Sequence, residues 1–229
     1  MAFWCSQGRA RDILQELTDT DLSSASFPWL TGRKINVGHA HATALRVNFV
    51  GELGWELHHP IDMQTAIFDL LMETGEKFDL RPFGIKAMDS MRLEKSYRVV
   101  GRELSIEYSA HESGLQRFVR MDKGDFLGRD GLAAREGAAA NRFVTMEVHG
   151  VTDADARGSE PILRGDTLVG RTTSGGYGWR VGKSLALAMV SPHFGEIGTE
   201  LEVVILGERH RAVIIPESPY DPTNERLRA

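Results

Sequence analysis

The 229-residue sequence has little cysteine, no excess of basic residues and no long apolar run. Its single cysteine, Cys5, excludes a disulfide within the chain and fits a reducing compartment. The formal net charge is −5, so the basic footprint of a nucleic-acid-binding protein is missing. No segment approaches the apolar length that crosses a bilayer. We therefore expect a cytoplasmic protein that binds small molecules, with neither nucleic acid nor a membrane as a partner.

The sequence also lacks the spacing of a metal site and of a dinucleotide-binding loop. Histidines form close pairs at His39 and His41 and at His58 and His59. No third and fourth ligand follows at a recognised spacing, so we expect no metal. No Gly-x-Gly-x-x-Gly stretch follows a predicted strand, so we expect no flavin site within this chain.

What the sequence does contain is a distinctive stretch over residues 45–57. Apolar residues alternate with others through Phe49, and the alternation resumes at Trp55, which predicts two half-buried strands joined at a glycine-bracketed turn. Glu52 lies at this turn. A turn glutamate is ordinarily a solvated charge, because ionised carboxylates are rarely buried without a partner. The pattern alone leaves both a solvated and a ligand-binding Glu52 open.

A second stretch, residues 84–95, has helical spacing. Ile85, Met88 and Arg92 fall on one helical face, so the arginine shares the apolar stripe. The alternative is an ion pair between Arg92 and Asp89, three residues earlier, which on a surface is worth a few tenths of a kcal/mol. Residue patterns alone do not decide between a ligand-binding and a paired Arg92.

These stretches resemble the aminomethyltransferase family, which comprises the glycine-cleavage T-protein and the folate-binding C-terminal regions of dimethylglycine and sarcosine dehydrogenases. The run from Phe49 to Leu57 resembles the family's Tyr-Thr-Gly-Glu-x-Gly-x-Glu pattern. The run from Asp89 to Glu94 resembles its Asp-Ser-Leu-Arg-Leu-Glu helix. Four further segments in the same order are similar to the family: residues 97–104, 122–129, 173–178 and 182–187.

The resemblance implies that part of the family fold precedes this sequence. Gln7 and Gly8, ahead of a predicted helix, are similar to a helix near the middle of the family's folate-binding region, although Arg9 stands where the family usually has proline. The aspartate that assists one-carbon transfer in the family lies earlier, and no position here matches it. We therefore name no catalytic residue and expect the back portion of a larger fold.

Local patterns predict the other elements of the first part. A short buried strand over residues 1–5 precedes a helix whose apolar positions recur over residues 10–17. A strand is expected near residues 33–37. The next helix begins near Asp62, as N-cap, and ends at Gly75.

The segment from Tyr97 to Leu115 has few periodic apolar positions, and we expect a long connection that lines a cleft. A turn over residues 122–128 then precedes a helix over residues 130–136. Beyond residues 137–141 the apolar period changes from helical spacing to alternation.

Short apolar strands with glycine turns fill the rest of the chain, and Gly165 and Asp166 read as a hairpin turn. No long helix interrupts them, which predicts a small antiparallel barrel. We therefore predict an α+β fold in two domains: an antiparallel sheet with packed helices over residues 1–136, and a C-terminal antiparallel β-barrel over residues 142–229.

The resemblance further implies a function and a set of binding residues. Family members transfer an amine-bound methylene group to tetrahydrofolate, giving methylenetetrahydrofolate and a freed amine. Glu52 would accept hydrogen bonds from the pterin edge, and Arg92 would hold another polar part of the folate. Phe49, where the family often has tyrosine, would stack on a ring, and Tyr177 is a further candidate through its glycine-rich loop.

The partners implied are therefore folate and a small methylated amine or aminomethyl donor, with a flavin dehydrogenase part or subunit elsewhere. A different class of function is also open, a non-catalytic module that keeps the fold for folate binding or assembly. In a third, structural interpretation, Arg92 pairs with Asp89 or Glu94 and Glu52 caps a turn. Iron–sulfur assembly proteins of the same fold are disfavoured, because their cysteine-bearing motif is missing.

Overall fold

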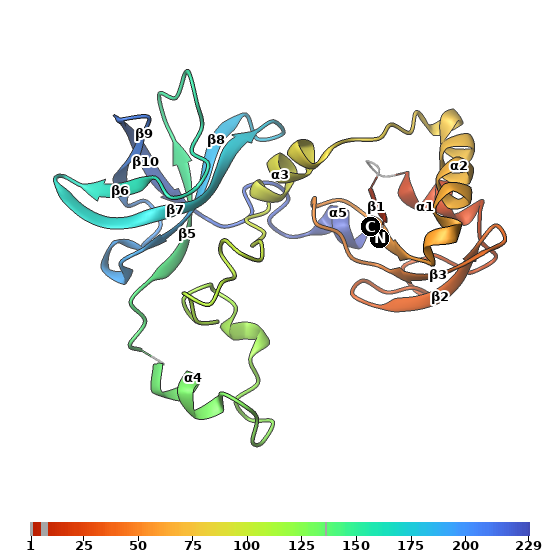
Figure 1. Ribbon diagram of the computed structural model, residues 1–229, viewed down its shortest axis with the longest axis horizontal. Coiled ribbons are helices and arrows are strands. Elements are labelled where there is room, and N and C mark those ends of the chain that lie inside the picture. The colour runs from red at the N-terminus through yellow and green to blue at the C-terminus, as the bar shows by residue number, and fades with distance from the viewer. Residues whose placement is uncertain (1, 6–8, 136) are drawn as a thin grey trace. The chain divides into compact units, whose positions relative to one another are not determined.

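The computed structural model describes residues 2–5, 9–135 and 137–229 (Figure 1). The chain divides into two compact units, and each contains its own sheet and hydrophobic core. The first comprises residues 1–88 and 221–229, and the second comprises residues 89–220. Among the described residues, no helix is both long and apolar enough to cross a membrane.

The first unit is an antiparallel sheet of four strands in the order β1-β4-β3-β2. Its strands are β1 (Ala2–Cys5), β2 (Gly32–Val37), β3 (Ala40–Leu45) and β4 (Gly54–His58). Its helices are α1 (Ala10–Gln15), α2 (Gln64–Gly75) and the C-terminal α5 (Glu225–Arg228). The predicted strands near residues 1–5 and 33–37 and the helix after residue 10 are confirmed; the predicted burial of the first strand lies outside the described residues.

Alternation along β2 and β3 decides which face of this sheet is buried. Ile35 and Val37 lie in the core with every second residue of β3, whereas Lys34 and His41 face outward. The core side packs against α1 and α2 through Ile13, Leu14 and Ile67. The outward face therefore keeps its polar side chains accessible, and a cavity lies there.

Two sequence predictions in this unit are wrong. The strand expected over residues 45–50 ends at Leu45, and residues 46–53 form an irregular connection to β4. The Asn48 side chain explains this, because its Oδ1 accepts hydrogen bonds from the backbone N–H of Val50 and Gly51 and holds a turn. Asp62 is no N-cap: it lies in a 3₁₀ turn before α2, whose first turn has no side-chain cap.

The end of the chain returns to the first unit. Leu227 of α5 is 2% exposed, and the Ala229 carbonyl accepts hydrogen bonds from Arg11 and Arg46. Arg46 is also buried and donates to the Phe27 carbonyl. Burial lowers the pKa of Arg46, and the nearby Arg11 charge adds to this. The last residues thus satisfy polar groups that the rest of the unit leaves open.

Helix α3 (Ile85–Leu93) begins in the first unit and ends in the second. The predicted stripe of Ile85, Met88 and Arg92 is not a buried face, because Ile85 is 72% exposed. Only Arg92 and Leu93, in the last turn, are fully buried. The helix therefore packs through its C-terminal end, where one of the two buried side chains is charged.

The long connection predicted after residue 97 is confirmed: residues 97–115 contain turns and one isolated bridge between Val100 and Leu104. It lines two cavities of the second unit. The helix predicted at residues 130–136 is α4 (Arg129–Arg135).

The second unit is completed by a closed antiparallel barrel of six strands, as the sequence predicted. The strands pair in the order β10-β5-β8-β7-β6-β9, and β9 pairs back with β10. They are β5 (Arg142–Val148), β6 (Pro161–Arg164), β7 (Thr167–Gly178), β8 (Lys183–Val190), β9 (Glu200–Ile205) and β10 (Glu208–Ile215). Closure leaves no free strand edge in the barrel, and inward aliphatic side chains fill its core.

Strand β7 departs from regular geometry at Thr173, where its register against β8 shifts between Thr172 and Ser174. In a regular strand successive side chains point to opposite faces, whereas a bulge allows two neighbours to point the same way. The hydroxyls of Thr173 and Ser174 consequently reach one carboxylate, that of Glu103.

Candidate functional site

The four residues predicted to bind folate divide between the two units. Phe49 and Glu52 belong to the first unit, and Arg92 and Tyr177 belong to the second.

Glu52 lies in the connection between β3 and β4, next to Gly51, whose φ is +80°. Its side chain is 6% exposed, and its Oε2 lies 3.9 Å from Nη1 of Arg226. Its backbone carbonyl accepts a hydrogen bond from the Asn48 side chain. Glu52 is therefore a shielded carboxylate and not a solvated turn charge, while Asn48 is the residue that closes the turn. Phe49 is half-buried in the same loop.

Arg92 is fully buried at the end of α3. Its Nε donates to Oδ1 of Asp89 at 3.0 Å, and its Nη1 donates to the Tyr97 carbonyl at 3.2 Å. The same Nη1 lies 3.6 Å from Oε2 of Glu103. The ion pair with Asp89 that the sequence left open is thus present, and a second carboxylate joins it.

Glu103 was not singled out by sequence reasoning, although its carboxylate is completely buried. It accepts hydrogen bonds from the hydroxyls of Thr173 at 2.6 Å and Ser174 at 2.5 Å, and from the Val99 N–H at 2.9 Å. Its strand partners lie about seventy residues further along the chain, and no local pattern reports such a contact. Arg92 and Glu103 together fix the long connection to the barrel.

Glu94 has a different cation from the one the structural interpretation suggested. Its Oε2 accepts from Arg180 Nε at 2.7 Å, and its Oε1 accepts from the Arg180 N–H at 2.6 Å. Burial on its own lowers the pKa of Arg180, but contacts with Tyr220 and Glu94 outweigh it and raise that pKa above its ordinary value. Glu94 therefore pairs with Arg180 in the β7–β8 turn and not with Arg92.

Tyr177 lies near the end of strand β7, not in the glycine-rich loop that the sequence suggested. It is 38% exposed, and its ring packs edge-on against Trp179 with 5.0 Å between the centroids. Its carbonyl accepts a hydrogen bond from the Ser90 hydroxyl of α3. Two accessible aromatic rings thus stand beside the end of α3 within the second unit.

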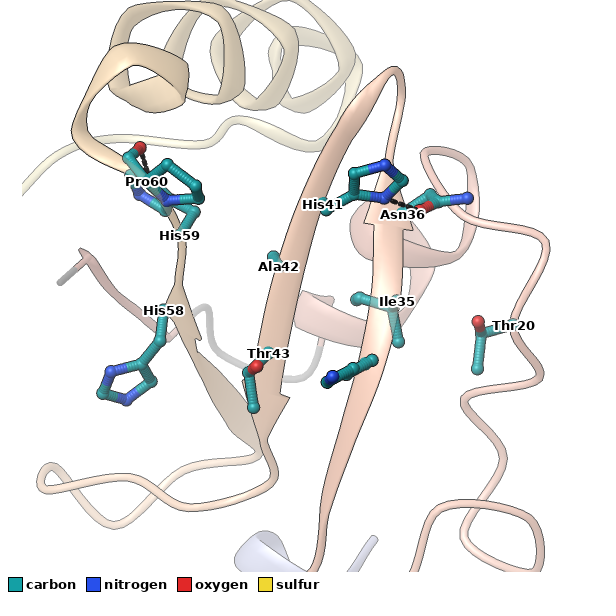
Figure 2. Close-up of a pocket in the computed structure, with 10 residues that line it drawn as sticks. Thr20, Ile35, Asn36, His41, Ala42, Thr43, His58, His59 and Pro60 are labelled. Carbon is teal, nitrogen blue, oxygen red and sulfur yellow. Dashed lines mark hydrogen bonds between the residues drawn. The ribbon is translucent and has the colours of Figure 1, made fainter.

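The outward face of the first unit's sheet carries a cavity of about 660 Å³ (Figure 2). His41 Nδ1 lies 2.7 Å from Asn36 Oδ1, so this nitrogen is the donor, whereas His58 points away from that pair. His59 Nδ1 lies 2.8 Å from the Pro60 carbonyl. In the described part of the chain, no three His, Cys, Asp or Glu side chains are placed to hold a metal ion. The residues that line this cavity include three histidines, His41, His58 and His59.

Family models match both parts of the chain. The GCVT N-terminal domain matches residues 7–123, and the glycine cleavage T-protein C-terminal barrel domain matches residues 141–221. The chain belongs to the glycine cleavage T-protein family. Membership in this family confirms the resemblance on which the sequence analysis relied.

Similar proteins of this family come from several functional branches. Mitochondrial dimethylglycine dehydrogenase of Homo sapiens is 37% identical and covers 96% of this chain and 26% of its own length. The 4-methylaminobutanoate oxidase (formaldehyde-forming) of Paenarthrobacter nicotinovorans is 32% identical and covers 96% of this chain and 27% of its own length. The aminomethyltransferase of Moorella thermoacetica is 34% identical and covers 90% of this chain and 56% of its own length. The chain thus spans about a quarter of the two oxidising enzymes and just over half of the aminomethyltransferase.

A solved structure of the T-protein family shares the fold. The glycine cleavage system aminomethyltransferase T from Bartonella henselae superposes with a TM-score of 0.80 at 19% identity, covering 93% of this chain and 57% of that one. The predicted α+β sheet followed by an antiparallel barrel is therefore confirmed.

Proposed function

We propose that this chain is a tetrahydrofolate-binding, one-carbon-transfer region that acts on a small methylated amine or an aminomethyl donor. One observation carries the proposal: the two domains of the T-protein family follow one another in family order along the chain. The names of three similar proteins support the substrate class, since they specify a dimethyl, methylamino or aminomethyl compound. Two of these are oxidising enzymes, which favours a flavin dehydrogenase part or subunit as partner.

The first unit offers suitable chemistry for the pterin. The Glu52 carboxylate is shielded from water, and a shielded carboxylate forms stronger charge-assisted hydrogen bonds with paired N–H donors than it does in water. Phe49, three residues earlier, provides an aromatic face. In our proposal Glu52 and Phe49 orient the pterin, so that the reacting nitrogen is positioned and water is excluded.

Replacing Arg92 should disturb the fold more than replacing Tyr177. Tyr177 is 38% exposed, and in our proposal its ring, which packs edge-on against Trp179, stacks on the ligand. Arg92 contributes to folate binding only together with its ion pairs to Asp89 and Glu103. Replacing Arg92 should therefore weaken both folate binding and folding. Replacing Glu52 is the clearer test of folate binding.

The deciding experiment is thermal and chemical unfolding of this polypeptide with tetrahydrofolate. A ligand at about one hundred times its dissociation constant adds roughly 2.7 kcal/mol to the free energy of unfolding. We expect this stabilisation with the native sequence and with the control Glu73→Gln, which changes an exposed residue of α2. We expect it to disappear in Glu52→Gln, whose own stability should stay nearly unchanged.

The same experiment separates two kinds of function. Stabilisation by tetrahydrofolate together with formation of methylenetetrahydrofolate from an amine donor supports the transfer region. Stabilisation with no transfer supports the alternative, a folate-binding or assembly module. Equal stabilisation of the native protein and Glu52→Gln contradicts the role of Glu52.

A further inference from the structure

The second unit contains a polar cavity of about 340 Å³ that the folate proposal does not use. Arg102 comes from the long connection, Arg157 from the segment before β6, and Arg171 from β7. Three arginines from three segments thus line one small space, and Glu107 is the one acidic residue among the described residues that line it.

Arg171 is held rigidly in this cavity. Its Nε and Nη2 donate to the Tyr108 hydroxyl at 3.0 and 2.7 Å, and its Nη2 is paired with Glu107. The hydrogen bond with Tyr108, together with Glu107, raises the pKa of Arg171 against the opposing effect of burial. Glu107 is therefore already neutralised by a fixed cation.

Among the described residues, neither Arg102 nor Arg157 has a carboxylate partner. Arg102 Nη1 makes one long hydrogen bond, 3.4 Å, to the Ser174 hydroxyl. Within the part of the chain that the structure describes, the Arg157 side chain makes no hydrogen bond or ion pair. An arginine carries five donors and a permanent charge, so most of the donors of both side chains point to solvent or to a ligand.

Nearby carboxylates accept hydrogen bonds from other groups. Glu160 accepts hydrogen bonds from the N–H groups of Arg157 and Gly158, at 2.9 and 2.8 Å, and from the Thr172 hydroxyl. Glu103 is bound beneath the cavity by Thr173 and Ser174 and faces Arg92. Both carboxylates thus accept hydrogen bonds from other donors, and neither is hydrogen-bonded to the Arg102 or Arg157 side chain.

An apolar groove of about 560 Å³ adjoins the cavity and shares Gly101, Ser105 and Tyr108 with it. Two aliphatic side chains of the groove region are strongly exposed, Val100 at 83% and Ile106 at 106%. Tyr108 therefore links the two spaces, since its hydroxyl binds Arg171 on the polar side and its side chain lines the groove.

We propose that the cavity and the groove form one binding site for a small organic acid. The carboxylate pairs with Arg102 and Arg157, beside the fixed Arg171, because the guanidinium fork matches two carboxylate oxygens. The apolar body of the ligand covers Val100 and Ile106. A free phosphate shares the anionic chemistry but leaves the groove exposed, so the groove favours a carboxylate on an apolar body.

Four probes test the two halves of the site by isothermal titration calorimetry at constant ionic strength. They are 4-phenylbutyrate, which has both parts, 4-phenylbutanol, which lacks the charge, acetate, which lacks the body, and inorganic phosphate. We expect saturable binding of 4-phenylbutyrate and much weaker binding of the other three. Tighter binding of phosphate than of 4-phenylbutyrate would overturn the assignment of the ligand class.

Matched variants locate the binding. Arg102→Gln and Arg157→Gln should each weaken 4-phenylbutyrate binding about tenfold to one hundredfold, as expected for the loss of one charge-assisted hydrogen bond. The control Arg120→Gln removes an exposed arginine outside the cavity, paired with Asp122, and should leave the affinity unchanged. Equal affinity in all three variants would place the acid elsewhere and overturn the proposal.

This proposal does not depend on folate binding, because the probes contain no pterin. Tetrahydrofolate stabilisation that persists in Arg157→Gln while 4-phenylbutyrate binding falls shows two separate sites. If 4-phenylbutyrate fails to bind the native protein, the acid site is excluded, and the folate proposal keeps its own test through Glu52→Gln.

Discussion

Arg92 and Glu103 have side chains 1% and 0% exposed, so each is a buried charge whose cost depends on the other. Asp89, the other partner of Arg92, is 43% exposed and is therefore better hydrated. Removing one member of a buried pair leaves an uncompensated charge, which is more damaging than replacing both members. The two residues are coupled for this reason.

Replacing Arg92 by methionine should lower the free energy of unfolding by about 3 kcal/mol, since Glu103 keeps its hydroxyl and N–H donors but loses its cation. Urea unfolding measures this loss. Arg120→Met, at an exposed ion pair, should change stability by less than about 0.5 kcal/mol. If Arg92→Met behaves like this control, the ion pairs are dispensable and Arg92 is available for a ligand.

The Glu112 carboxylate should contribute to folding stability in a way that is lost in acid. Burial on its own raises its pKa, but hydrogen bonds from Ser109 and Asn141 outweigh burial and hold that pKa below its ordinary value. A lowered pKa in the folded state means that the stabilisation is present above the ordinary glutamate pKa of about 4.3 and is lost as pH falls through the folded value. Glu112→Gln should therefore be less stable than the native protein at pH 7.

Urea unfolding of the native protein and Glu112→Gln at a series of pH values checks this prediction. The difference in unfolding free energy should shrink steadily as the pH falls below the ordinary glutamate pKa. A difference that stays constant with pH would mean that Glu112 acts through packing and not through its charge.

Strand β7 contains a glycine whose position leaves no room for a side chain. A Cβ atom at Gly175 would lie 2.3 Å from the Ala156 carbonyl oxygen, which is backbone and has no rotamer to adjust. Gly131, in α4, has nothing within 4 Å of the same position. The two glycines therefore give opposite predictions for the same substitution.

Gly175→Ala should destabilise the barrel by several kcal/mol or prevent folding, because backbone must move. Gly131→Ala should stabilise the protein by roughly 0.5–1 kcal/mol, as alanine is the better helix former. Thermal unfolding monitored by circular dichroism compares the two. A neutral Gly175→Ala would show that β7 and the segment at Ala156 are not closely packed.

Local signals were sufficient for most elements. Helical spacing identified α1, and glycine turns between apolar runs identified the barrel strands, because those patterns act within a few residues. The end of β3 at Leu45 was missed, since the alternation continues beyond it while the Asn48 side chain takes over the backbone donors. The glycines around Tyr177 are typical of a turn and predict a loop, whereas Gly175 allows close packing within a strand.

The candidate site was less predictable than the fold. The sequence selected Glu52 and Arg92 by resemblance, but their burial and partners depend on contacts between distant segments. The Thr173–Glu103 hydrogen bond joins a bulge in β7 to the long connection, and no spacing in the sequence announces it. The convergence of Arg102, Arg157 and Arg171 is likewise a property of the closed barrel and its flanking loops.

On the scale of the whole molecule, the first unit is discontinuous, because residues 221–229 join residues 1–88 after the barrel has intervened. Replacing Leu227 by alanine should cost roughly 2 kcal/mol, at the low end for a buried leucine. Hydrogen exchange should show faster exchange in β2 and β3 and unchanged protection in β5 and β8. Loss of protection in both units together would show that they unfold as one.

This discontinuity also sets an order for synthesis on the ribosome. Domains generally fold as units while the chain emerges from its N-terminus, yet the first unit lacks one carbonyl partner of Arg46, that of Ala229, until residues 221–229 have been translated. All six barrel strands precede those residues. The six barrel strands are therefore available before residues 221–229, and the first unit is completed only after the barrel strands have been made.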